Sequence, residues 1–198
     1  KLNLLRSLYF TSLHQAITQG VLHDIQGGVY TGNWSLSQKH GEGDMKWNNG
    51  DHYVGSFHQD NIHGDGVMNT KAGTYKGSYK DGHKDGLGTF IYHSGHRYEG
   101  QWKRNRFHGR GMYQWKNGKK YDGEWVDGVR SGSGITVMPN GEKHDGGYKN
   151  NEFSGAGWWR FSSGKVRPGE WTAGKLDRWT GPEQFEAQMK AKRAMKKK

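Results

Sequence analysis

Histidines are the residues of this 198-residue chain that most invite a chemical role, and eleven are present. His40, His63 and His108 recur at one place in a repeating pattern, directly before a Gly-x-Gly pair. Equivalent side chains of adjacent hairpins lie two strands apart, about 9.6 Å, whereas the ligands of one metal ion lie within about 2 Å of it. We therefore predict structural histidines, with no metal site and no cofactor.

Catalytic motifs are absent from the sequence. The chain contains no Cys, which excludes thiol catalysis, disulfide scaffolds and cysteine-ligated metal centres. It has no nucleophile elbow, P-loop or complete GxGxxG motif, and its carboxylates are scattered among basic residues rather than paired. We predict that the chain is not an enzyme.

Positive charge is concentrated in two stretches of a chain whose formal net charge is +11. Residues 97–120 hold eight basic side chains and one acid, and six basic residues oppose two acids after Gly181. Such clusters attract acidic proteins or phosphoinositides, whereas a solvated basic surface without a ligand is the alternative; we do not expect nucleic acid. The candidate anion- or lipid-binding residues are Arg97, Lys103, Arg104, Arg106, Arg110, Lys116, Lys119 and Lys120.

The elements that must position these residues follow from a repeat with a period of 22 or 23 residues. In each repeat, aromatic residues and glycine alternate with period two, which places them on one face of a β-strand. The cassettes are Tyr30-Gly32-Trp34, Tyr53-Gly55-Phe57, Tyr75-Gly77-Tyr79, Tyr98-Gly100-Trp102 and Tyr121-Gly123-Trp125, followed by the degenerate His144-Gly146-Tyr148 and Arg167-Gly169-Trp171.

A Gly-x-Gly pair follows each of the first six cassettes, for example Gly41 and Gly43, which we expect on one face with Met45. Pairs such as Asn49-Gly50 supply the residues that tight turns require. Glycine in a strand leaves a gap that a neighbouring ring can cover. Aromatic rings on glycine backbone can therefore replace an aliphatic core, and each period predicts one β-hairpin of an antiparallel meander.

This pattern resembles the MORN family (membrane occupation and recognition nexus repeats), whose unit reads roughly Tyr-x-Gly-x-Trp-x-x-Gly/Asn-x-x-x-Gly-x-Gly. The resemblance covers residues 20–174 and weakens where His144 replaces the leading Tyr and where Arg167 and Pro168 open the last repeat. It implies cytoskeletal, ciliary or membrane-adjacent roles. Among short chains built almost wholly of these repeats, it implies most often the radial-spoke head of the axoneme.

The predicted fold is mainly β: an extended, single-layer, solenoid-like antiparallel meander of about six to seven hairpin repeats, or roughly 13 strands, with short helices at both termini. Residues 1–19 are expected to form an N-terminal helical cap, on the approximate helical spacing of their leucines. Residues 20–174 form the repeat array. Residues 175–198 form a basic C-terminal helix or tail, whose helical start is indicated by Pro182.

The face of the sheet opposite the cassettes changes from polar to apolar along the array. In the first repeat its second strand carries Glu42, Asp44 and Lys46, whereas later repeats carry aliphatic and aromatic side chains there. An apolar strip on a single-layer sheet indicates that something lies on it, either a terminal helix of this chain or a helix of a partner. We favour the partner, and the predicted binding residues are Leu87, Ile91, Met112, Ile135, Val137 and Trp158.

These features predict a non-catalytic scaffold that binds other protein subunits, through a helix or an extended segment on the sheet, in a larger assembly of the cytoplasmic cytoskeleton or cilium. Two alternatives stay open. One is a module that binds phosphoinositides or other acidic phospholipid through the basic residues. The other is an accessory subunit of an organellar membrane complex, in the mitochondrion or elsewhere, which the acid-free start of the chain indicates.

Overall fold

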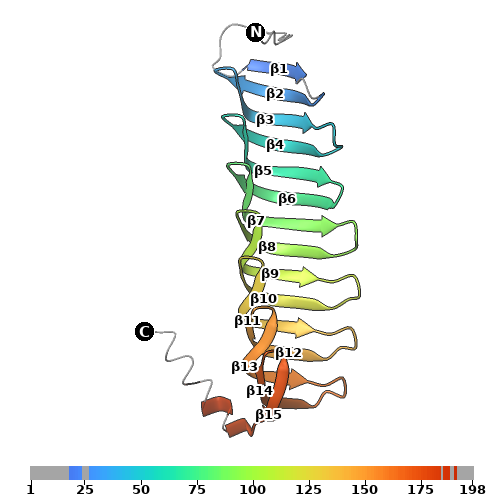
Figure 1. The fold of residues 1–198 in the computed structure, drawn as a ribbon, viewed down its shortest axis with the longest axis vertical. Helices are drawn as coiled ribbons and strands as arrows, with labels where there is room; N and C mark the ends of the chain where they lie inside the picture. Colours follow the sequence, from blue (N-terminus) through green and yellow to red (C-terminus); the bar gives the residue numbers. More distant parts are fainter. Residues whose placement is uncertain (1–17, 24–26, 184, 188–189, 191–198) are drawn as a thin grey trace. The chain divides into compact units, whose positions relative to one another are not determined.

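The structure, a computed structural model, describes residues 18–23, 27–183, 185–187 and 190. Fifteen strands follow one another in chain order as an antiparallel meander (Figure 1), which confirms the predicted mainly β fold of hairpin repeats and exceeds the roughly 13 strands expected. The strands are β1 (Thr18–His23), β2 (Val29–Ser35), β3 (Gln38–Lys46), β4 (His52–His58), β5 (Asn61–Thr70), β6 (Gly73–Lys80), β7 (His83–Tyr92), β8 (Arg97–Lys103), β9 (Arg106–Gln114), β10 (Lys120–Val126), β11 (Val129–Val137), β12 (Lys143–Lys149), β13 (Glu152–Arg160), β14 (Val166–Thr172) and β15 (Lys175–Trp179).

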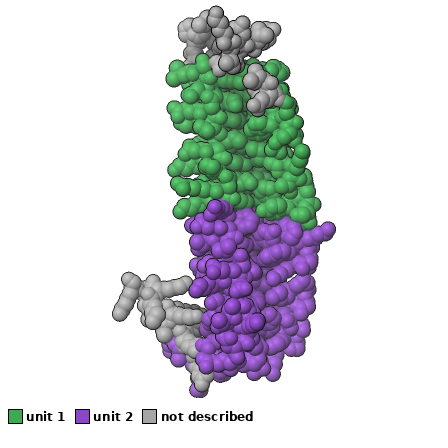
Figure 2. All heavy atoms as spheres, in the orientation of Figure 1, with its two compact units in different colours: residues 1–95, 102–105 green, residues 96–101, 106–198 purple. Residues whose placement is uncertain are grey.

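The chain divides into two compact units, which Figure 2 shows in different colours. Unit 1 comprises Lys1–Gly95 and Trp102–Asn105, and unit 2 comprises His96–Gln101 and Arg106–Lys198. The same kind of hairpin recurs within each unit, so the glycine–aromatic repeat directs one local structure throughout.

Two kinds of connection alternate along the meander. One is a two-residue turn in which both residues have positive φ, as at Asn150-Asn151 with 51° and 71°. This is the geometry of a type I′ turn, whose twist matches that of the flanking strands. The other is the longer connection that holds the predicted Asn-Gly pairs, where Gly50 alone has positive φ, at 90°. The sequence predicts only the second kind, because residues as varied as Leu36 and Ser37 occupy the first.

The two glycines of each Gly-x-Gly pair have different roles. Gly132 has a φ of 72° beside a register shift between β10 and β11, and a Cβ on it would meet the side chain of Glu124. Gly134 lies under a ring, since a Cβ added there would lie 2.5 Å from Cε2 of Tyr121. The expectation that both glycines share the ring-covered face is therefore wrong, because a β-bulge at the first one turns it away.

The core of each unit consists of the leading tyrosines and the rings that pack against them. Tyr121 is fully buried, and its ring meets that of Trp125 edge-on, with centroids 5.2 Å apart and an interplanar angle of 85°. We call the side of the sheet that bears these rings the aromatic face and the other side the opposite face. The leading tyrosines, each at most 1% exposed, are Tyr30, Tyr53, Tyr75, Tyr98 and Tyr121.

The sheet extends past both ends of the predicted repeat array. Residues 18–19 belong to β1, which pairs with β2. In this pairing Gly20 lies opposite Gly32, as the glycines of neighbouring strands do elsewhere in the sheet. β15 likewise extends the sheet with residues 175–179, which follow a further positive-φ turn. Residues 1–17, most of the predicted N-terminal cap, lie outside the described residues. At the other end, helical backbone begins at Pro182, where the sequence predicts it.

Candidate protein-binding surface

Apolar and acidic side chains alternate from strand to strand on the opposite face of unit 2. In the register of β9 to β13, Asp122 lies between Met112 and Ile135, and Asp145 lies between Ile135 and Trp158. The second strand of each hairpin supplies the apolar residue and the first supplies the acid. This row therefore offers regularly spaced apolar contacts, each beside a carboxylate.

A cavity of about 590 Å³ opens on this face across strands β11 to β14. Its apolar wall includes Ile135 and Val166, which are 41% and 42% exposed and so have large surfaces free for contact. Its two cationic side chains form no ion pair with any acid among the described residues. The residues that line the cavity are Ile135, Lys143, Asp145, Trp158, Arg160 and Val166.

The C-terminal segment of the chain already uses one edge of this surface. Phe185, which is 2% exposed, packs against Trp158 with ring centroids 4.4 Å apart. A side chain from a helical turn is thus accommodated on the opposite face. Of the two occupants expected for the apolar strip, a terminal element of this chain covers part of Trp158.

The other predicted binding residues are divided between the two units. Val137 pairs with Lys143 in β12 and lies in the row next to Ile135. Leu87 and Ile91 are 67% and 53% exposed but belong to unit 1. Unit 2 thus brings together four of the six predicted residues, and the cavity itself involves two of them.

The eight predicted anion-binding residues do not share one face. By strand alternation Arg110 and Lys120 lie on the opposite face, whereas Lys119 contacts the ring of Trp115 on the aromatic face. Arg97 is already paired, with its Nη2 2.7 Å from Oε2 of Glu99. The remaining members are Lys103 and Arg104 in unit 1 and Arg106 and Lys116 in unit 2.

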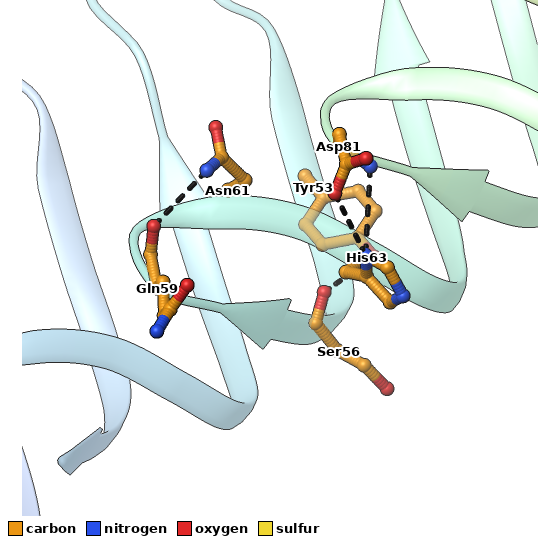
Figure 3. Close-up of polar contacts among 6 residues, drawn as sticks. All are labelled: Tyr53, Ser56, Gln59, Asn61, His63 and Asp81. Carbon is orange, nitrogen blue, oxygen red and sulfur yellow. Dashed lines mark hydrogen bonds and ion pairs between the residues drawn. The ribbon is translucent and has the colours of Figure 1, made fainter.

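His40, His63 and His108 take part in ring contacts or ion pairs. His63 pairs with Asp81 at 3.4 Å between Nδ1 and Oδ1 (Figure 3). The ring of His58 lies between those of His40 and His63, with centroid distances of 5.0 and 5.6 Å. His58 was missed because it ends the first strand of its hairpin, away from the repeated position. Within the described ranges, no group of three or more His, Asp or Glu residues is arranged to hold a metal ion.

Cations on the aromatic face also escaped the sequence analysis. The Nζ of Lys84 lies 4.5 Å from the ring centroid of Phe90 and 5.1 and 5.2 Å from those of Tyr75 and Trp102. Burial lowers the pKa of the Lys84 amine. The available signal was positional, since Lys84 stands nine residues after its leading Tyr, where Ile62 stands in the preceding repeat.

Comparison with protein families matches six MORN repeats, at residues 30–52, 53–71, 75–97, 98–120, 121–143 and 144–166. These matches span well over half of the chain, and the chain belongs to the MORN repeat family. Proteins of this family carry repeats for protein or membrane interaction. A search of curated protein sequences gives no match.

Solved structures to which the chain is similar include two CPAP domains. One is the TCP domain of SAS-4 (dCPAP) from Drosophila melanogaster, in complex with a proline-rich motif of Ana2 (dSTIL), with 9% identity over 76% of this chain and 88% of that chain and a TM-score of 0.44. The other is the wild-type TCP10 domain of CPAP from Danio rerio, with 12% identity over 82% of this chain and 88% of that chain and a TM-score of 0.43. Neither likeness is close enough to carry an argument about partners. No helix within the described residues is long and apolar enough to cross a membrane.

Proposed function

We propose that this MORN repeat protein is a non-catalytic scaffold that seats a helix of a partner polypeptide on the opposite face of unit 2, within a cytoskeletal assembly of the ciliary axoneme, of the radial-spoke kind. The observation that carries this proposal is the cavity beside Trp158, with exposed Ile135 and Val166 in its wall. The ciliary setting rests on the resemblance of the repeat to those of the MORN family.

The spacing of the surface suits a helix that crosses the strands. Apolar residues of successive hairpins, such as Ile135 and Trp158, recur every two strands, or about 10 Å. Two turns of an α-helix advance about 11 Å, so a helix with apolar residues at heptad spacing can contact consecutive hairpins. Lys143 and Arg160, which form no ion pair among the described residues, favour acidic residues on the flanks of such a helix.

The test is Ile135→Asp in the full chain, expressed in ciliated cells, with Val126→Asp as the matched control. Val126 is a similarly exposed aliphatic residue of unit 2, at 47%, and lies outside the cavity. We expect the Ile135→Asp variant to be lost from the detergent-resistant axonemal fraction and the Val126→Asp variant to remain in it. Hydrogen exchange would first establish that both variants are folded. Full retention of the Ile135→Asp variant in the axonemal fraction would then contradict the proposal.

Binding to an acidic membrane surface is the second candidate, and the positive net charge favours it. Co-sedimentation with phosphatidylserine vesicles across a salt series tests it. Binding driven by the basic residues falls steeply as salt rises. The membrane candidate would replace the scaffold proposal if the Ile135→Asp variant still binds vesicles and is also fully retained in the axonemal fraction.

A further inference from the structure

One repeat position on the aromatic face of unit 2 changes from apolar to cationic. Nine residues after the leading aromatic, two repeats carry Phe107 and Phe153, and the repeat between them carries Arg130. Phe107 stacks on Tyr98 with ring centroids 3.8 Å apart, so in that repeat the side chain at this position fills space over the leading ring. Arg130 fills the same space, with its Cζ 5.4 Å from the ring centroid of Tyr121.

A second cation joins Arg130 on one aromatic ring. The Cζ of Arg130 lies 5.6 Å from the ring centroid of Trp115, and the Nζ of Lys119 lies 5.2 Å from the same centroid. All three side chains are half-buried. The sequence brings them together because Trp115 and Lys119 flank one connection between strands and Arg130 lies on β11, across the intervening β10.

Neither cation is neutralised by a carboxylate within the described part of the chain. Neither Lys119 nor Arg130 forms an ion pair with an Asp or Glu of the described residues, and the guanidinium of Arg130 donates instead to the backbone carbonyl of Asn151. Burial and the nearby charge of Arg130 lower the pKa of Lys119, and burial lowers the pKa of Arg130. Two like charges held together in a half-buried place repel each other, and a bound anion would relieve that repulsion.

We propose that Trp115, Lys119 and Arg130 form a carboxylate-binding site for an acidic segment of a partner polypeptide. The planar guanidinium can donate two parallel hydrogen bonds to a carboxylate, and the Trp115 ring offers an apolar contact to the residue beside it. The terminal segments 1–17 and 191–198 contain no Asp or Glu, so they supply no acidic side chain to this site.

An acidic polypeptide fits this site better than an anionic membrane does. Glu142 occupies the position of Lys119 in the next repeat, so the charge along this edge changes sign within one period. A bilayer needs a broad surface of one sign, whereas a peptide can place a single carboxylate between two cations. The source to which we commit is therefore a protein segment.

This site adds a second binding surface to the one proposed above. Arg130 and Ile135 both lie on β11, Arg130 on the aromatic face and Ile135 on the opposite face. In a single-layer sheet the two faces are available independently. One short stretch of unit 2 can thus hold two polypeptide segments back to back, which is how a scaffold joins two subunits.

The test is calorimetric titration of the full chain with a short poly-L-glutamate peptide at low salt. The variant is Arg130→Phe with Lys119→Gln, which installs the ring that neighbouring repeats carry and removes both charges. The matched control is Lys149→Gln with Lys175→Gln, which also removes two charges, from exposed lysines of unit 2 that lie outside the site. We expect the Arg130→Phe, Lys119→Gln variant to weaken binding at least about tenfold and the control to change it less than about twofold.

Three outcomes would overturn the proposal. Equal losses in the Arg130→Phe, Lys119→Gln variant and in the control would mean attraction by net charge alone. Unchanged binding in the Arg130→Phe, Lys119→Gln variant would place the anion elsewhere. If the unchanged chain binds phosphatidylserine vesicles but not poly-L-glutamate, and the variant no longer binds the vesicles, the site belongs to lipid. Ile135→Asp changes the opposite face and should leave poly-L-glutamate binding unchanged. The carboxylate site and the helix-binding surface can therefore fail independently of each other.

Discussion

Two consecutive repeats of unit 2 form the same kind of buried ring pair from different residues. In the Tyr121 repeat the tyrosine Oη donates to the carbonyl of Glu124 at 2.9 Å, and Nε1 of Trp125 donates to the carbonyl of Gly111 at 2.9 Å. In the next repeat His144 replaces the tyrosine and Tyr148 replaces the tryptophan. The shorter imidazole does not make the equivalent bond, and its buried Nε2 has no hydrogen-bond partner within the described part of the chain.

The rings of the two repeats nevertheless meet in the same way. The pair Tyr121–Trp125 has a centroid distance of 5.2 Å and an angle of 85°, and the pair His144–Tyr148 has 5.4 Å and 84°. The polar atoms are satisfied along another route, since the Tyr148 Oη lies 2.6 Å from Oγ1 of Thr136 and 3.2 Å from Nδ1 of His144. The repeat therefore requires an edge-on ring pair above glycine, whereas the hydrogen bonds that hold the pair can be redistributed.

The largest expected effect separates the two repeats at the glycine under the ring. A Cβ on Gly134 would lie 2.5 Å from Cε2 of Tyr121, whereas a Cβ on Gly157 would approach His144 no closer than 2.8 Å. Gly134→Ala should lower the free energy of unfolding by about 3 kcal/mol or more, and Gly157→Ala by about 1–2 kcal/mol. Denaturant unfolding of both variants measures this, and equal losses would show that the smaller ring gives no extra room.

Acid sensitivity should distinguish the His144 repeat from the others. Burial lowers the pKa of His144 from 6.5 to about 4, so on acidification the unfolded chain binds this proton before the folded chain does. The stability that neutral His144 contributes is complete above pH 6.5 and is lost as the pH falls toward 4, by up to about 3 kcal/mol.

Replacing this histidine with the residue of the other repeats gives the control. His144→Tyr should unfold with a free energy that falls less between pH 7 and pH 4.5 than that of the unchanged chain, as followed by denaturant titration at each pH. A parallel pH dependence of the two proteins would mean that His144 takes up its proton as readily in the folded chain as in the unfolded chain.

The smallest effect concerns the hydroxyl groups. Tyr121→Phe removes one donor to a backbone carbonyl and should cost about 1 kcal/mol. Tyr148→Phe leaves both Thr136 and His144 without their shared partner and should cost about 2 kcal/mol. Hydrogen exchange of β11 and β12 would show the larger loosening in Tyr148→Phe, and the reverse order would contradict the rerouted network.

Repeat spacing and strand alternation were sufficient to predict the hairpins, the ring-on-glycine core and the apolar row of Met112, Ile135 and Trp158. Alternation relies on a regular strand, and it failed where the backbone is irregular. Gly132 in its β-bulge is such a place, because a positive φ reverses the direction that its position in the sequence implies.

The charged parts of the surface were harder to predict than the core. A run of basic residues was interpreted as one cluster, but consecutive residues such as Lys119 and Lys120 lie on different faces of the sheet. Arg130 was not selected, because its role depends on contacts with Trp115 and Tyr148 from other hairpins. The contact of Phe185 with Trp158 likewise joins residues far apart in the sequence.

Site-specific photo-cross-linking from the cavity wall tests the central claim, that the opposite face of unit 2 seats a partner helix. The full chain would carry p-benzoylphenylalanine at Val166, 42% exposed and in the cavity, or at the control Val126, 47% exposed and outside it. In ciliated cells we expect the Val166 probe to capture one axonemal polypeptide through a helical segment, and the Val126 probe to capture none. Equal capture from both positions, or adducts from Val166 only to this chain's own C-terminal residues, would contradict the claim.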